Sequence, residues 1–123
     1  MATLLIIDDE QDICDIVRDI FEDEGFCVLR TKTGTEGVHL AKTHRPDVVL
    51  LDMKLGSSMT GVDVLSEIKR HDPAAKIIVI TGASEANLES EAREMGVDAY
   101  VEKPFTPPQI VSVVRSVFRE PRR

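Results

Sequence analysis

The amino-acid sequence predicts an α/β domain in which a doubly wound, five-stranded parallel sheet is covered by five helices. Short apolar runs alternate along the chain with longer stretches whose apolar residues recur at helical spacing. Three of the runs are apolar without interruption, as in strands that are buried on both faces, and the other two are weaker. Strands 1, 3 and 4 are therefore expected inside the sheet and strands 2 and 5 at its edges. The resulting order, 2-1-3-4-5, is flavodoxin-like, with a switch point between strands 1 and 3.

The first strand covers residues 3–8, ends on Asp8 and is followed by Asp9. A helix follows it, because apolar residues recur at helical spacing on one face. Asp9 is a candidate N-cap for this helix, and Gly25 is a candidate C-cap residue. The predicted apolar face consists of Ile13, Ile16, Val17, Ile20 and Phe21.

The second strand, 26–30, is short and mixed in composition, which suits an edge position. Thr33 and Glu36 have the spacing of a capping box at the start of a second helix, which ends before Pro46. The third strand, 48–52, consists of four apolar residues followed by a carboxylate. An irregular loop, 53–60, then leads to a third helix over residues 61–71.

The fourth strand, 76–81, contains the uninterrupted apolar run 77–80 and ends on Thr81. A fourth helix starts at Ser84 and is closed by Gly96, and a short fifth strand occupies 99–101. Thr106-Pro107-Pro108-Gln109 then combines a capping box with a proline in the first helical turn, so it predicts the start of a fifth helix. We expect residues 1–120 to form one domain and 121–123 to be a tail or the start of a linker.

Composition restricts the function of the chain. With 42% hydrophobic and 30% charged residues, it is typical of a folded globular domain and too apolar for disorder. The net charge is −7 and the cations are dispersed, which argues against nucleic-acid binding by this chain. No segment has the pattern of a signal peptide or a membrane span, so a cytoplasmic location without membrane contact is expected. Cys14 and Cys27 lack metal or redox spacing and are interpreted as reduced packing residues.

Polar side chains follow four of the predicted strands. In open α/β sheets, ligands bind outside the carboxyl ends of the strands, so these side chains should converge on one edge. Three neighbouring carboxylates repel one another unless they share a proton or hold a cation, and an all-oxygen site with room for water suits Mg²⁺. A carboxylate beside such a cation can act as a nucleophile toward phosphorus, while a lysine and a hydroxyl hold phosphoryl oxygens. The residues concerned are Asp8, Asp9, Asp52, Thr81 and Lys103.

This set of motifs resembles the receiver domain of response regulators, as found in two-component signalling and in chemotaxis regulators. The resemblance covers essentially the whole chain and rests on Asp8-Asp9, Asp52, Thr81 and Lys103-Pro104, each at the end of a strand. It implies that Asp52 accepts a phosphoryl group from the phosphohistidine of a sensor histidine kinase or a phosphotransfer protein. It further implies a phosphorelay phosphoprotein that is not an enzyme, beyond slow hydrolysis of its own aspartyl phosphate.

The resemblance also implies how the metal is held. Asp8 and Asp9 would bind Mg²⁺ directly or through water, together with Asp52 and the backbone carbonyl of Lys54. The loop that follows departs from the family pattern. Gly56 stands where the family usually has a proline, and the subsequent glycine comes one residue late, so the loop is longer than expected.

A further implication of the resemblance is a phosphorylation switch. Lys103 would pair with the phosphoryl group and precede a cis peptide bond to Pro104. Thr81 and Tyr100 match the paired switch positions of the family. Their rearrangement would alter the surface of the fourth helix, fifth strand and fifth helix, which could serve a downstream effector protein or domain, or a homodimer.

Taken singly, these residues have ordinary structural explanations. Asp8 and Asp9 could do no more than cap a helix, Thr81 could be a turn residue, and Tyr100 could pack at the edge of the sheet. A single lysine after a strand, such as Lys103, is normally a solvated side chain. Lys54 is likewise interpreted as a solvated side chain, although a cation two residues after Asp52 could alter the lifetime of a phosphoryl group.

Other functions remain as alternatives. A phosphohydrolase of the haloacid-dehalogenase kind needs an Asp-x-Asp spacing after its first strand, which Asp8-Asp9-Glu10 lacks. A flavodoxin-like flavin carrier needs a phosphate loop rich in Gly, Ser and Thr, where this chain has acids. A receiver-like binding module that acts without phosphorylation, and a phosphate sink or relay, are the alternatives nearest to the leading interpretation.

Overall fold

The computed structural model describes residues 1–56, 59–82 and 86–119, and it has a single five-stranded parallel sheet in the order β2-β1-β3-β4-β5. The fold class and the strand order predicted from the sequence are thereby confirmed. The predicted helix start at Ser84 and the tail 121–123 lie outside the described residues. The strands are β1 (Thr3–Ile7), β2 (Cys27–Thr31), β3 (Val48–Asp52), β4 (Ile77–Thr81) and β5 (Ala99–Glu102).

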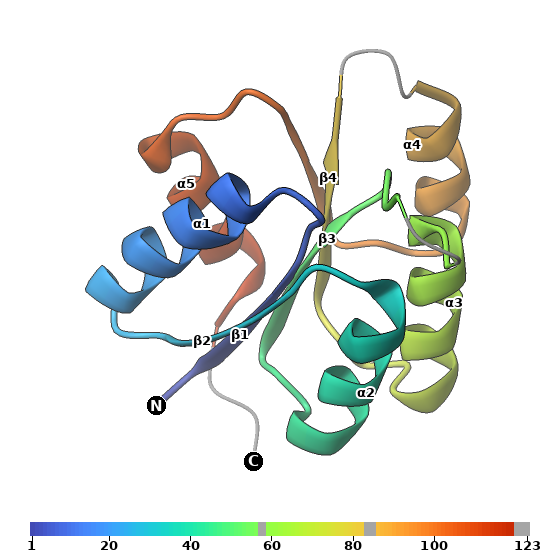
Figure 1. Cartoon of the computed structure of the whole chain (residues 1–123), viewed down its shortest axis with the longest axis horizontal. Coiled ribbons are helices and arrows are strands. Elements are labelled where there is room, and N and C mark those ends of the chain that lie inside the picture. The colour runs from blue at the N-terminus through green and yellow to red at the C-terminus, as the bar shows by residue number, and fades with distance from the viewer. Residues whose placement is uncertain (57–58, 83–85, 120–123) are drawn as a thin grey trace.

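Within the described residues, five helices cover the two faces of the sheet. In Figure 1, α1 and α5 lie on one side, and α2, α3 and α4 lie on the other. The N-terminus lies at the lower left of this view, while the carboxyl ends of the strands point to the top. The helices are α1 (Gln11–Asp23), α2 (Gly34–His44), α3 (Gly61–His71), α4 (Ala86–Glu94) and α5 (Pro107–Val117). Within the described ranges, no helix is long and apolar enough to cross a membrane.

The uninterrupted apolar strands are explained by the two helical layers. Successive side chains of a strand point to opposite faces of its sheet. Accordingly, Leu4 and Ile6 of β1 pack in the core beneath α1 and α5, and Leu5 and Ile7 pack in the core beneath α2 and α3. Because both faces are covered, every position of the inner strands must be apolar until the strand leaves the core. The first polar residue after each run therefore marks the carboxyl end of the strand, where the chain leaves the core.

The helix starts are specified locally. The capping box of Thr106 with Gln109 is present as predicted, and Thr33 accepts a hydrogen bond from the backbone N–H of Glu36. The predicted cap at Asp9 is wrong, since Glu10 is the N-cap residue of α1 and its side chain makes no capping bond.

The reason lies in the turn after β1. The carboxylate of Asp8 accepts a hydrogen bond from the backbone N–H of Glu10 at 2.9 Å, which holds the chain in a turn and delays the helix. The Asp9 side chain is thereby available for a contact elsewhere at the sheet edge.

The buried face of α1 also differs from the prediction. Ile16, predicted to face inward, is 45% exposed, whereas Cys14, Val17 and Phe21 are buried. These three positions follow the i, i+3, i+7 spacing of one helical face, and Ile16 lies beside that face. Because isoleucines dominate this stretch of the sequence, the sequence pattern did not show that Cys14 belongs to the buried face. The burial of Cys14 confirms its interpretation as a packing residue. Cys27 does not, because its side chain is exposed.

Candidate functional site

The carboxyl ends of the inner strands bring the predicted aspartates together. Asp8 directly follows β1 and Asp52 is the last residue of β3, and the pairing of Ile7 with Leu51 places them side by side. Both residues are buried: the exposed fraction of the surface is 0% for Asp8 and 3% for Asp52. Asp9 and Glu10 complete an acidic cluster in which one carboxylate oxygen from each residue lies within 4.8 Å of the others.

Lys103 places its ammonium group in the middle of this acidic cluster. Its Nζ lies 3.0 Å from Asp8 Oδ2, 2.9 Å from Glu10 Oε1 and 3.4 Å from Asp52 Oδ2. Only 19% of the lysine side chain is exposed, so the interpretation as a solvated lysine is wrong. The backbone N–H of Lys103 donates to the Thr81 carbonyl at 2.7 Å, which ties the residue to the end of β4. The Lys103–Pro104 peptide bond is cis, as expected.

Burial and mutual repulsion determine the protonation of the site. Burial raises the pKa of Asp52 to about 7, and the charge of the neighbouring Asp8 carboxylate raises it further. The hydrogen bond from Lys54 N–H and the charge of Lys103 act in the opposite direction but are outweighed. Burial likewise raises the pKa of Asp8 above its ordinary value. For Lys103, burial would lower the pKa, but the close contacts of its ammonium group with the Glu10 and Asp8 carboxylates outweigh burial and raise it. The single positive charge of Lys103 therefore does not fully compensate the two buried carboxylates, Asp8 and Asp52.

The oxygen atoms of the acidic cluster fit a hard divalent cation. The inner oxygen of Asp8, Oδ2, is buried and accepts no hydrogen bond from the described part of the chain, although it forms an ion pair with Lys103. Carboxylate oxygens of this kind, with water filling the remaining positions, suit Mg²⁺. A cavity of about 510 Å³ opens above Asp52 and has room for water and a phosphoryl group. Its lining includes Asp9, Glu10, Lys54 and Lys103.

The loop after β3 is tied to the acidic cluster at two points. The backbone N–H of Lys54 donates to Asp52 Oδ1 at 3.0 Å, while its side chain is exposed. The backbone N–H of Gly56 donates to Asp9 Oδ2 at 3.2 Å. A proline at this position would lack that N–H, so the departure from the family pattern supplies a contact to one of the carboxylates.

Thr81 and Tyr100 lie at different depths. Thr81 is the last residue of β4 and is buried at the same edge as Asp52. Tyr100 lies on the neighbouring edge strand, paired with Val79, and is half-buried. The guanidinium of Arg93, from α4, lies 4.7 Å from the centre of its ring, a cation–π contact. The two predicted switch positions are therefore on adjacent strands, but Tyr100 is outside the acidic cluster.

Two contacts of the site were not predicted from the sequence. Glu10 joins the acidic cluster, and only its position immediately after Asp8-Asp9 could have indicated this. The Cys14 thiol donates to the backbone carbonyl of Asp8 at 3.3 Å, and burial raises the pKa of Cys14 to about 11. The thiol is therefore neutral at physiological pH and supports the turn that positions Asp8.

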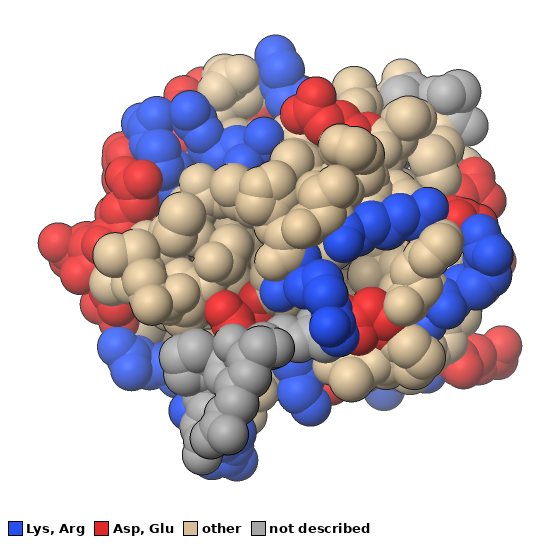
Figure 2. Space-filling view, turned by 90° about the horizontal axis from the view of Figure 1, so that it is seen from below, with Lys and Arg blue, Asp and Glu red and all other residues tan. Residues whose placement is uncertain are grey.

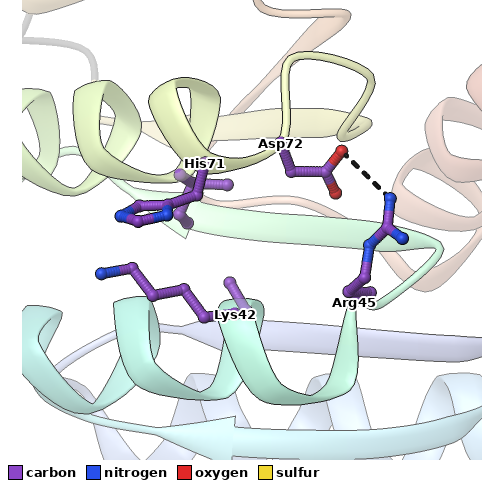
Figure 3. Close-up of a pocket in the computed structure, with 6 residues that line it drawn as sticks. Lys42, Arg45, His71 and Asp72 are labelled. Carbon is purple, nitrogen blue, oxygen red and sulfur yellow. Dashed lines mark ion pairs between the residues drawn. The ribbon is translucent and has the colours of Figure 1, made fainter.

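The opposite edge of the sheet has different chemistry. Seen from below, Lys and Arg side chains gather near the middle of this face (Figure 2). A cavity of about 160 Å³ lies there between the ends of α2 and α3, where Arg45 pairs with Asp72 at 3.7 Å beside Lys42 and His71 (Figure 3). Basic residues in the last turn of a helix complement its dipole, which explains their presence. No predicted site residue lines this cavity.

Comparison with known proteins shows the family to which this fold belongs. The model of the response regulator receiver domain family matches residues 4–115. Response regulator SaeR of Staphylococcus aureus (strain USA300) is 37% identical over 111 residues, which is 90% of this chain and 48% of SaeR. The chain thus spans about half the length of the curated relatives it matches.

Two solved receiver structures are similar over more than nine tenths of their length. A CheY-like receiver domain protein from Methanospirillum hungatei JF-1 superposes with a TM-score of 0.89 at 28% identity, covering 94% of this chain and 92% of that one. A receiver domain protein from Clostridium thermocellum has a TM-score of 0.89 at 30% identity, covering 96% and 94%.

Proposed function

Because this chain belongs to the response regulator receiver domain family, we propose that it is a phosphoacceptor of a two-component system and that Asp52 is the residue phosphorylated. The observation that carries the proposal is the meeting of three aspartates and one lysine at the carboxyl edge of the sheet. Of the two buried carboxylates, Asp52 is the one that lines the open cavity, so a donor can reach it.

Mg²⁺ is the proposed cofactor. Asp8, Asp9 and Asp52, with the backbone carbonyl of Lys54, would hold it. When bound, the ion supplies charge neutralisation for the phosphoryl oxygens. The acidic cluster supports this assignment, since its excess of carboxylates repels an anionic donor in the absence of a cation.

The residues of the chain have separate roles in the transfer. A carboxylate oxygen of Asp52 forms the bond to phosphorus, while the phosphorus–nitrogen bond of the donor phosphohistidine breaks and leaves its electron pair on the imidazole. The Lys103 ammonium pairs with one phosphoryl oxygen, and the Thr81 hydroxyl donates to another. Such a domain is not an enzyme, apart from slow hydrolysis of its own aspartyl phosphate.

The consequence of phosphorylation would be a change of surface. Movement of the Thr81 hydroxyl toward the phosphoryl group would release space for Tyr100, whose ring lies against Arg93 of α4. The surface of α4, β5 and α5 would then favour a downstream effector protein or domain, or a homodimer. The donor would be a sensor histidine kinase or a phosphotransfer protein, and the location would be the cytoplasm.

Intact-protein mass after incubation with acetyl phosphate tests the proposal. We expect one added phosphoryl group with Mg²⁺, none with a chelator, and none in Asp52→Asn. Addition that is insensitive to the chelator would overturn the role of the metal.

The switch is tested separately with beryllofluoride, a mimic of the phosphoryl group. Amide shift changes should extend from the site through residues 81–119 and be weak on α2. Changes restricted to the loops around Asp52 would make the domain a phosphate sink or relay instead.

A further inference from the structure

Glu10 is the member of the acidic cluster that has no assigned role. Its Oε1 accepts a hydrogen bond from Lys103 Nζ at 2.9 Å, the shortest of the three contacts that this ammonium makes with carboxylates. The Glu10 side chain is 60% exposed, whereas Asp8 and Asp52 are buried. Glu10 therefore holds Lys103 from the solvent side of the cavity.

An ammonium group has three N–H donors, and here three carboxylates surround it. A phosphoryl group on Asp52 needs one of those donors, so one carboxylate must give way. Asp8 is enclosed, and Asp52 is the residue that carries the phosphoryl group. Glu10 can turn into water, which solvates its released charge, so it is the partner that leaves at least cost.

We propose that Glu10 is a latch on Lys103, a positioning residue that holds the ammonium in the unphosphorylated protein and is displaced when a phosphoryl group arrives. The inference rests on the proposed function of Asp52. The latch lowers the affinity of the site for a phosphoryl group, because the bond between Glu10 and Lys103 is lost on phosphorylation. It also keeps the lysine ordered while the site is empty of phosphate.

Glu10 could alternatively act through its charge or as a metal ligand, and two substitutions separate these roles. Glu10→Gln keeps the length of the side chain and removes its charge. Glu10→Asp keeps the charge and shortens the side chain by one methylene, so that it no longer reaches Lys103. Asp12→Asn is the matched control, because Asp12 is an exposed acid in the first turn of α1 that makes no contact with the acidic cluster.

The apparent dissociation constant of beryllofluoride in the presence of Mg²⁺, followed by amide shifts, is the principal measurement. Both Glu10 variants should bind beryllofluoride about two- to fivefold more tightly than the wild type, the range expected for loss of one partly exposed ion pair. Asp12→Asn should bind as the wild type does. In metal-free protein, the side-chain ammonium protons of Lys103 should exchange faster in both Glu10 variants, a readout that needs neither metal nor phosphate.

The other outcomes are distinct. Tighter binding in Glu10→Gln alone would overturn the latch in favour of a purely electrostatic effect. Weaker binding of Mg²⁺ in both variants, with weaker beryllofluoride binding, would make Glu10 a metal ligand instead. Unchanged affinity in both variants would also overturn the latch while leaving the role of Asp52 intact. If the wild type itself bound no beryllofluoride, the proposed function would fail, and the inference with it.

Discussion

Removing the charge of Asp52 should stabilise the metal-free protein at neutral and alkaline pH. Burial, with the charge of Asp8, raises the pKa of Asp52 from 3.8 to about 7. Between these values the folded protein binds more protons than the unfolded chain, so the free energy of unfolding falls as pH rises from about 4 to 7. A difference of roughly three in pKa corresponds to at most about 4 kcal/mol. Asp52→Asn removes this penalty.

Urea unfolding in the presence of a chelator, between pH 5 and 8, measures the effect. We expect the wild type to lose stability across this range, and Asp52→Asn to be more stable at pH 8 by about 2 kcal/mol. The figure is half the limit, because the variant also removes a partner of Lys103. Asp12→Asn, an exposed acid outside the acidic cluster, is the control and should follow the wild type.

Two results would refute this reasoning. One is a wild-type stability that is constant or rises between pH 5 and 8 in the absence of metal. The other is an Asp52→Asn protein that is less stable than the wild type at pH 8. Added Mg²⁺ should stabilise the wild type at pH 8 but have little effect on the variant.

Three further substitutions test separate parts of the site. Lys103→Ala leaves two buried carboxylates without their cation, so at pH 7 it should destabilise the protein by about 1–3 kcal/mol. This loss is smaller than that for breaking a fully buried ion pair, because protonation of the carboxylates compensates part of it. An unchanged urea midpoint would contradict the burial argument. Lys54→Ala should leave stability unchanged and alter the half-life of the phosphorylated protein several-fold, which corresponds to about 1 kcal/mol in the barrier to hydrolysis. An unchanged half-life would mean that Lys54 is only a solvated side chain. Gly61→Ala places a methyl group 2.4 Å from the Cα of Met53, so thermal unfolding should show a loss of about 1–3 kcal/mol, whereas Ser66→Ala, on the exposed face of α3, should not.

The sheet and its functional edge could be predicted because their signals are local. Each inner strand is an apolar run, and the first polar residue after the run must lie where the core ends. Asp8, Asp52 and Thr81 therefore had predictable positions before their contacts were known. Parallel strand order then brought the two aspartates together without any further information.

The environment of Lys103 could not be predicted in this way. Its bond to Glu10 joins residues 93 positions apart, and it depends on the turn that the Asp8 carboxylate imposes on the chain. A lysine after an edge strand has the same sequence pattern whether it is solvated or enclosed. The exposure of Ile16 could not be predicted either, for a local reason. Four isoleucines and valines lie near one face of the helix, so the sequence pattern does not decide, to within one position, which side of the helix faces the core.

The most direct test of the account is to locate the phosphoryl group. After incubation with acetyl phosphate and Mg²⁺, borohydride reduces an aspartyl phosphate to homoserine, and peptide mass spectrometry then identifies the converted residue. The account predicts homoserine at position 52 and unmodified aspartate at positions 8 and 9, with no conversion when a chelator is present. Homoserine at position 8 or 9, or phosphate on a serine, threonine or histidine with Asp52 unchanged, would contradict the assignment of Asp52 as the phosphoacceptor.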